Sequence, residues 1–441
     1  MKPQKKGLSL GSIVIIIILI IVLFACIWLF PKLFGDLNTR INPEKISKTF
    51  VNFTKNSLEV VSNSLVTNTK EPDNQNIKLD FSTHSFSEPT PTPILEDEVV
   101  NFSILFTGNV NYDKKIQKAT LKNTDYFDTD AIFLNIKKYI DSDINVLGLS
   151  NTFVDNESLS DINAPVSLIS SIKNIGINTI NHGNNNSLNY GLEGIQSMLS
   201  SANYNNIVLN GIDAESYDDD ILIQNVKNIP VAFLHYTQSL SKTSKKKIPE
   251  QNWSYHINII SEERVRNDIL KAKEQGALFV VVTLDWEKST GKSPSKEQIN
   301  VAQYIAEAGA NIIIANNQNN PLILDILNTS NENILSRNVP IAYSLGNLIS
   351  SNANNIAQAS SIMLKFDITY NRTKNKVETI KISYIPLYIW KNKVDKKDNF
   401  SIIPIDFSID AEDKKHINFK NKVEEYLNEL FGILPITVVN N

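Results

Sequence analysis

The stretch Ile104-Leu105-Phe106-Thr107-Gly108-Asn109-Val110 is an apolar run that ends in a glycine and an asparagine. Three later apolar runs also end in polar loops: 177–180 before Gly183-Asn184-Asn185-Asn186, 278–284 before Asp285-Trp286-Glu287, and 311–314 before Ala315-Asn316-Asn317-Gln318-Asn319. Ligands of open α/β sheets bind outside the carboxyl ends of the strands. We therefore expect the four loops to converge on one site.

From Val99 onward, short apolar runs alternate with helical patterns. Strands are expected at 102–107, 144–149, 177–181, 206–210, 230–236, 278–284, 311–315 and 339–345. Helices are expected at 130–141, 165–175, 192–202, 261–275 and 296–308. This alternation indicates an α/β fold with crossover units and a largely parallel sheet. Residues 361–366 and 377–386 instead alternate with period two, as antiparallel edge strands do, and 420–431 form a predicted terminal helix.

The composition of the chain argues against some partners and excludes some kinds of site. The chain has 441 residues, of which 42% are hydrophobic, enough for one large core plus a tail. A net charge of -4 without a basic stripe argues against nucleic acid as a partner. One basic group, Lys242 with Lys245, Lys246 and Lys247, fits a solvated loop better than an anion-binding patch. Cys26 is the only cysteine, so a disulfide within one chain is excluded.

The N-terminal part predicts a membrane anchor. Residues 13–30 carry no charge and are long enough to span a bilayer, while Lys2, Lys5 and Lys6 precede them. We therefore expect a single-pass protein of the cell membrane with a cytoplasmic N-terminus. A lipidated Cys26 is the alternative anchor. The expected organisation is a cytoplasmic segment at 1–12, an anchor at 13–34, an extracytoplasmic stalk at 35–98, an α/β domain at 99–390 and a C-terminal extension at 391–441.

Six motifs carry a resemblance to a known family. In order, they are Gly108-Asn109-Val110, Gly148-Leu149-Ser150, Asn184-Asn185-Asn186-Ser187-Leu188-Asn189-Tyr190-Gly191, Asp285-Trp286-Glu287, Asn316-Asn317-Gln318-Asn319 and Tyr343-Ser344-Leu345-Gly346-Asn347. With this order the chain resembles, from about 102 to 348, the CapA family of capsule and poly-gamma-glutamate synthesis proteins. The resemblance implies a four-layer αββα sandwich related to the calcineurin-like metallophosphoesterases.

This chain departs from the family's pattern at the positions that would bind metal. The family's aspartate stands as Asn109, its glutamate as Ser150, and its histidines as Asn186, Asp285, Asn317 and Asn319. A two-metal site needs anionic oxygens and neutral imidazoles, so we expect no metal and no cofactor. Weak Ca²⁺ binding stays open because Ca²⁺ accepts carbonyl oxygens.

We therefore interpret the converging loops as a vestigial cleft that binds rather than reacts. Its expected residues are Asn109, Ser150, Asn185, Asn186, Asn189, Asp285, Trp286, Asn317, Asn319 and Asn347. The expected partners are an anionic or glycan cell-surface polymer and the proteins of a polymer-synthesis complex. The alternative is an active hydrolase or transferase acting on poly-gamma-glutamate or a phosphoester-like substrate, with Asp285, Glu287 and His235 as catalytic residues. We expect His182 and His235 to be hydrogen-bonded core histidines rather than metal ligands.

Overall fold

The computed structural model describes residues 97–123, 126–154, 158–214, 221–286, 293–316, 319–331 and 334–440. The predicted cytoplasmic segment, the predicted anchor at 13–34 and nearly all of the predicted stalk lie outside these ranges. No helix within the described ranges is long and apolar enough to cross a membrane.

One sheet has nine strands among the described residues, in the order β16-β15-β14-β1-β2-β5-β6, with β13 and β17 paired at its side. Strands β1, β2, β5 and β6 are parallel, whereas β14, β15 and β16 continue the sheet antiparallel beyond β1. The bounds are β1 Val99–Val110, β2 Ile144–Leu149, β5 Thr179–Asn181, β6 Val208–Asn210, β13 Asn347–Ile349, β14 Ser360–Asn371, β15 Lys376–Val394, β16 Lys397–Pro404 and β17 Ile436–Val439.

A second sheet has six strands among the described residues, in the order β11-β12-β10-β9-β8-β7. Its inner strands β8, β9, β10 and β12 are parallel, and the edge strands β7 and β11 are antiparallel. The bounds are β7 Leu222–Val226, β8 Ile229–Thr237, β9 Phe279–Asp285, β10 Ile312–Asn316, β11 Leu324–Asn331 and β12 Ile334–Ala342. A further pair, β3 (Thr152–Phe153) and β4 (Asn163–Ala164), follows β2.

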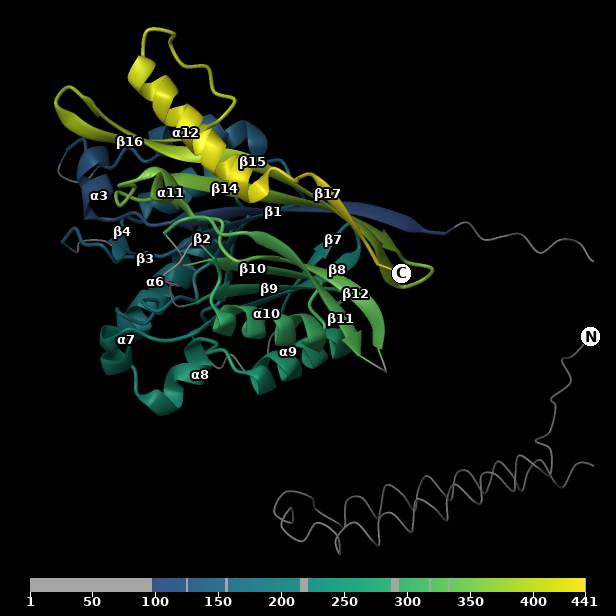
Figure 1. Cartoon of the computed structure of the whole chain (residues 1–441). Coiled ribbons are helices and arrows are strands. Elements are labelled where there is room, and N and C mark those ends of the chain that lie inside the picture. The colour runs from purple at the N-terminus through teal and green to yellow at the C-terminus, as the bar shows by residue number, and fades with distance from the viewer. Residues whose placement is uncertain are drawn as a thin grey trace, which may run out of the picture. The chain divides into compact units, whose positions relative to one another are not determined.

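The two sheets pack face to face, with helices on their outer faces (Figure 1). Side chains alternate along each strand, so neighbouring residues enter different cores. On β1, Leu105 packs with the outer helices, whereas Phe106 lies in the core between the sheets. The helices beside the first sheet are α3 Lys114–Thr120, α4 Asp130–Phe133, α5 Ser167–Asn174 and α6 Gly191–Tyr204; those beside the second are α9 Glu262–Glu274 and α10 Lys296–Ala308.

Local sequence explains where these helices begin. Helix α10 starts after Ser295, which forms a reciprocal capping box with Gln298, and its bounds agree with the prediction. The predicted helix at 130–141 is α-helical only over its first four residues, which form α4. A 3₁₀ helix continues over Leu134–Tyr139. The buried side chains Phe133 and Ile136 stand three residues apart, which matches the three-residue period of a 3₁₀ helix.

The α/β prediction is confirmed, but the expectation of a largely parallel sheet is wrong. The described residues build two large mixed sheets besides the β3–β4 pair, and hairpins supply part of the antiparallel pairing. Between β7 and β8, Lys227 and Asn228 have φ values of 50° and 63°. Positive φ at both central residues is the signature of a tight hairpin turn, so β7 folds back on β8.

The residues after 390 continue the same domain. The predicted start of the extension falls inside β15, and β16 then pairs with β15 from Leu387 to Val394. Helix α12 (Lys414–Phe431) begins six residues before its predicted start at 420 and buries Val423, Leu427 and Phe431 in the core between the sheets. Strand β17 then pairs with β15 at Thr379–Ile382.

Candidate functional site

The candidate site lies where the space between the sheets turns polar. Apolar residues of this core come from both sheets and include Val146, Phe233, Val281 and Ile314. Two residues further along the same strands stand Gly148, His235, Thr283 and Asn316. Because side chains alternate with period two, these residues face the same inter-sheet space as their apolar predecessors. The carboxyl ends of β2, β8, β9 and β10 therefore meet there.

A β-bulge turns Asn109 toward the same space. Phe106 pairs with Val146 and Asn109 with Gly148, so β1 uses three residue steps where β2 uses two. The extra residue reverses the alternation, so Asn109 and Phe106 share a face although they are three residues apart. The Asn109 side chain is buried, and its Nδ2 donates a hydrogen bond to Ser150 Oγ. Its register partner on β13 is Asn347, so three of the predicted residues lie together.

Glycine permits the backbones to approach closely beside Asn109. A Cβ on Gly108 would lie 2.5 Å from the carbonyl oxygen of Gly346, so only glycine fits there. Gly346 itself has a φ of +77°, a conformation that L side chains rarely adopt. The amide of Asn109 donates to the Gly346 carbonyl at 3.0 Å. These contacts fix the first and sixth motifs against each other.

Gly148 marks the point where both sheets meet. A Cβ on Gly148 would lie 2.9 Å from Asn109 Oδ1 and 3.0 Å from Asn316 Nδ2. Two side-chain amides, one from each sheet, therefore press against the α-carbon of Gly148. A larger residue at this position would push them apart. Asn316 Oδ1 is buried and has no hydrogen-bond partner among the described residues, so one acceptor in this polar end is unsatisfied.

The asparagines after β5 form a folded turn rather than a row of free ligands. Asn184 Nδ2 donates to the carbonyl oxygen of Leu149 at 3.1 Å, which ties this turn to the second motif. Asn189 Nδ2 donates to Asn186 Oδ1 at 3.1 Å. The Asn185 side chain is partly exposed at the surface of the turn. Of the predicted residues here, Asn189 has a positioning role, whereas Asn185 remains accessible to a ligand.

His235 joins the second sheet to the loops that follow β5 and β6. Its ring is buried, with Nε2 2.7 Å from the carbonyl oxygen of Gly183 and Nδ1 2.7 Å from Thr283 Oγ1. A carbonyl only accepts, so the ring proton is on Nε2. A Cβ on either Gly183 or Gly211 would lie 2.5 Å from His235 Cδ2, so two glycines make room for the ring. Burial lowers the pKa of His235 to about 4, and the imidazole is neutral at pH 7.

His182 and Asn210 were not among the predicted site residues. His182 Nδ1 donates to the Leu149 carbonyl at 3.1 Å, and its Nε2 is buried without a partner among the described residues. Burial and, to a smaller extent, nearby His235 lower the pKa of His182 to about 4. Asn210 Nδ2 donates to Asn181 Oδ1 at 3.0 Å, but its own Oδ1 is also unsatisfied within the described ranges.

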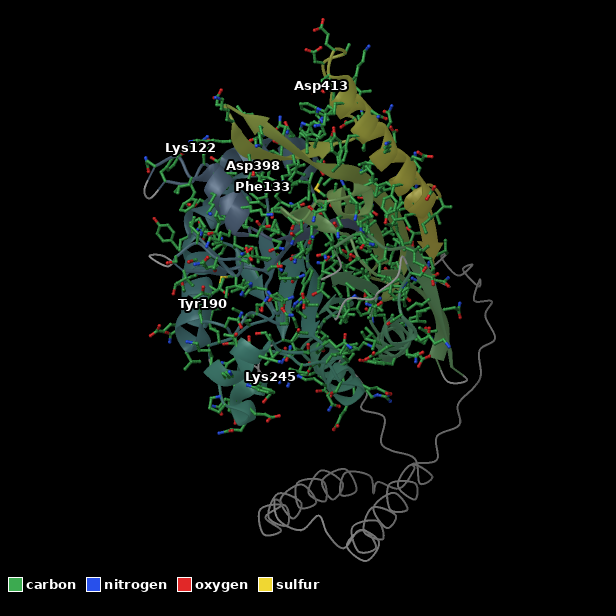
Figure 2. The ribbon with its side chains drawn as sticks, turned by 60° about the vertical axis from the view of Figure 1, so that its left-hand side comes forward. Lys122, Phe133, Tyr190, Lys245, Asp398 and Asp413 are labelled. Atoms are coloured by element: carbon green, nitrogen blue, oxygen red, sulfur yellow. The ribbon has the colours of Figure 1, made fainter. Side chains whose placement is uncertain are left out.

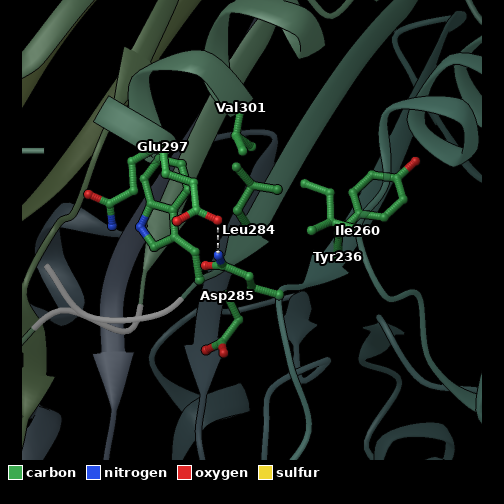
Figure 3. Close-up of a pocket in the computed structure, with 9 residues that line it drawn as sticks. Tyr236, Ile260, Leu284, Asp285, Glu297 and Val301 are labelled. Carbon is green, nitrogen blue, oxygen red and sulfur yellow. Dashed lines mark hydrogen bonds between the residues drawn. The ribbon is translucent and has the colours of Figure 1, made fainter. Parts of the chain in front are cut away.

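Asp285 and Trp286 occupy opposite faces of β9. Asp285 is buried, lies opposite Asn316 in the strand register and continues the inter-sheet face of Thr283. Trp286 packs on the helix side, where its ring stacks on Tyr343 with 5.7 Å between centroids. A small pocket lies on that side, and among its lining residues Gln238 donates a hydrogen bond of 2.9 Å to Glu297. The Asp285 carboxylate points away from this pocket (Figure 3). The structure therefore separates these two neighbours.

The remaining predicted residues lie at the edge of the described ranges. Asn317 and Glu287 fall outside them. Asn319 is partly exposed in the bend after β10. Asn316 was missed by sequence reasoning as a site residue, although it stands two residues after buried Ile314 and shares its face. The alternation of side chains along the strand, rather than the motif, could have predicted that Asn316 faces the site.

The described residues do not fit a two-metal centre. No group of three or more His, Cys, Asp or Glu side chains among them could hold a metal ion. Asp285 is a single carboxylate, and both ring nitrogens of His235 are already hydrogen-bonded. Asn109 and Asn316 contribute amides, which are weak ligands for transition metals. The donor set is suited to hydrogen bonding.

Comparisons with known proteins agree with the resemblance noted in the motifs. The family model described as bacterial capsule synthesis protein PGA_cap matches residues 103–352. The PGA biosynthesis protein CapA of Bacillus subtilis (strain 168) is 23% identical over 343 residues, covering 75% of this chain and 81% of that protein. The capsule biosynthesis protein CapA of Bacillus anthracis is 26% identical over 239 residues, covering 52% of this chain and 51% of that protein.

Solved structures with a similar arrangement include phosphoesterases. A novel phosphatase from Mycoplasma pneumoniae has a TM-score of 0.38 at 12% identity and covers 66% of this chain and 95% of that one. The calcineurin-like phosphoesterase YfkN from Bacillus subtilis has a TM-score of 0.36 at 12% identity and covers 75% of this chain and 99% of that one. Since the family model spans more than half of its 441 residues, the chain belongs to the bacterial capsule synthesis protein family PGA_cap.

Proposed function

We propose that this protein binds a cell-surface polymer during its synthesis, as a membrane-anchored and extracytoplasmic member of the family, without metal-dependent catalysis. The observation that carries the proposal is the contact of Asn109 and Asn316 over Gly148 at the polar end of the inter-sheet space. Amides stand where a two-metal phosphoesterase would need carboxylates and imidazoles. The sandwich is accordingly a metallophosphoesterase-type fold adapted to binding.

The chemistry of the amides supports a polymer with hydrogen-bonding groups. Each asparagine side chain both donates and accepts, so it can pair with the amides of a polypeptide or the hydroxyls of a glycan. Asn316 Oδ1 and Asn210 Oδ1 are buried acceptors without partners among the described residues. An unsatisfied buried acceptor costs about 1–3 kcal/mol, and a ligand that donates to it removes that cost.

The polymer class and the location come from the relatives and the N-terminal sequence. The names of the two curated relatives refer to PGA and to capsule biosynthesis. The uncharged run within 13–34, preceded by lysines, would hold the domain on the outer face of the membrane. Other proteins of the polymer-synthesis complex are the expected protein partners.

Binding of full-length protein to poly-gamma-glutamate and to capsule material tests the proposal. Asn316→Ala removes one side-chain amide from the site, and we expect about three- to tenfold weaker binding, the effect of one lost hydrogen bond. Asn203→Ala, at an exposed position near the end of α6, is the matched control. Wild-type protein that binds no polymer would refute the proposal, and equal affinity of the two variants would move the binding site elsewhere.

The alternative function is an active hydrolase or transferase on poly-gamma-glutamate or a phosphoester-like substrate. The observation that favours it is the buried carboxylate of Asp285, which faces the inter-sheet space opposite Asn316. Turnover of either substrate that disappears in Asp285→Ala would establish this alternative. Near-stoichiometric Mn²⁺ or Zn²⁺ in elemental analysis of the incubated protein would strengthen it further.

A further inference from the structure

We infer that the exposed lysines of α7 (Lys242–Lys247) form a docking surface for a polyamide that carries carboxylates. This inference rests on the proposed function, because it names where the polymer meets the protein. The α7 surface consists of Lys242, Lys245, Lys246 and Lys247, and all four residues are exposed. The expectation of a solvated loop is wrong, because these lysines lie on a short helix. Figure 2 shows Lys245 on this helix at the surface of the domain.

The α7 surface concentrates positive charge on one short helix. None of its four lysines forms an ion pair with any described residue. Lys242 faces Lys245 and Lys246 at spacings of three and four residues, where like charges destabilise a helix. Lys245 lies over the Trp253 ring at 5.6 Å, which holds one ammonium group in place. The chain as a whole has a net charge of -4, so this concentration is local.

Hydrogen bonds attach the α7 surface to the asparagine turn of the candidate site. Ser241 Oγ and Ser244 Oγ lie 2.7 and 2.8 Å from Asn189 Oδ1. The Ser241 amide donates to the Asn185 carbonyl at 2.8 Å. Ser241 also caps α7 through the Ser244 amide. Two serines thus fix the lysines next to the turn that contains Asn185, and a polymer on α7 would reach that turn directly.

The chemistry of the α7 surface and of the adjacent asparagine turn indicates which kind of polymer binds there. Exposed ammonium groups attract carboxylates, and the attraction is screened by salt. The partly exposed amide of Asn185 can pair with the amide groups of a polymer backbone. A polymer with both groups, such as an acidic polypeptide, satisfies both surfaces at once. A neutral glycan satisfies only the turn, and an anionic lipid surface satisfies only the lysines.

The experiment compares two charge-matched variants of the full-length protein. The first carries Lys242→Gln, Lys245→Gln, Lys246→Gln and Lys247→Gln. The control carries Lys391→Gln, Lys393→Gln, Lys396→Gln and Lys397→Gln, four exposed lysines of the β15–β16 hairpin. The probes are poly-gamma-glutamate, polyphosphate, neutral dextran, and vesicles of phosphatidylserine and phosphatidylcholine. Affinity is measured at two salt concentrations.

We expect the α7 variant to bind poly-gamma-glutamate at least tenfold more weakly than wild type, with a smaller salt dependence, while the control binds as wild type does. An equal loss of affinity in both variants, or no loss in either, would overturn the inference. The proposed function would still stand in that case, because the wild-type protein binds the polymer. Tighter wild-type binding to polyphosphate would overturn the polymer chemistry. A loss confined to anionic vesicles would reassign α7 to the membrane surface. Wild-type protein that binds none of the polymers would instead refute the proposed function.

Discussion

Acidification should destabilise this fold through two buried histidines. His182 and His235 have pKa values near 4 in the folded protein, against an ordinary value of 6.5, because burial disfavours the charged ring. The unfolded chain therefore binds protons more readily between pH 6.5 and pH 4, and stability falls as the pH falls through this window. From pH 7 to pH 5, each histidine removes about 2 kcal/mol of the free energy of unfolding, and the pair about 4 kcal/mol.

Urea denaturation at pH 7 and pH 5 measures this loss in wild type and in His235→Gln. Glutamine cannot titrate, so the variant should lose about 2 kcal/mol less than wild type over the same interval, whatever its stability at pH 7. Subtracting the variant's loss of stability between the two pH values from that of wild type cancels the contribution of the carboxylates, which titrate in both proteins. The same comparison with His182→Gln reports the second ring. If wild type and His235→Gln lose equal stability between the two pH values, the ring is not buried in its neutral form.

Three further predictions concern the site. Gly148→Ala places a Cβ about 3 Å from two amides, and we expect a loss of about 1–3 kcal/mol in the free energy of unfolding, measured by denaturant titration. Asn189→Ala removes the acceptor shared by two serine hydroxyls and should increase amide hydrogen exchange at 241–247, whereas unchanged exchange would contradict its anchoring role. Addition of Mn²⁺, Zn²⁺ or Ca²⁺ and its later removal with EDTA should both leave Tm unchanged, since no group of three or more His, Cys, Asp or Glu side chains in the described ranges could hold an ion; a metal-dependent rise of several degrees would refute this.

Strand positions were the most predictable part of the fold, because buried parallel strands appear as continuous apolar runs. Strand β2 was predicted with its observed bounds, and β9 within one residue. The edge strand β7 was not predicted, because its side chains are largely only partly buried and it lacks such a run. The strand pattern alone also did not reveal two sheets, which only the family resemblance implied. Sheet membership depends on which strands pair over long separations, as β1 does with β14, and a local pattern carries no such information.

The candidate site was predictable as a set of loops but not as a set of contacts. The motifs grouped Asn109 with Ser150, and these two side chains are hydrogen-bonded. They grouped Asp285 with Trp286, although alternation along β9 sends the two side chains to opposite faces. The bulge in β1 had no local sequence signal, yet it decides that Asn109 faces the inter-sheet space. Whether Asn317, Asn319 and Glu287 join the site stays a prediction.

The geometry of the site persists because ordinary protein contacts hold it in place. Here His235 links β8 to the Gly183 carbonyl, and Gly108 lets the first motif reach Gly346. Neither contact uses a side chain at the positions where the family resemblance implies metal ligands, so the loops stay in register without such ligands. Asparagine at such positions keeps a hydrogen-bonding group at each strand end, whereas an apolar residue would close the space. Under the proposed function, this retained polarity provides the groups that bind the polymer.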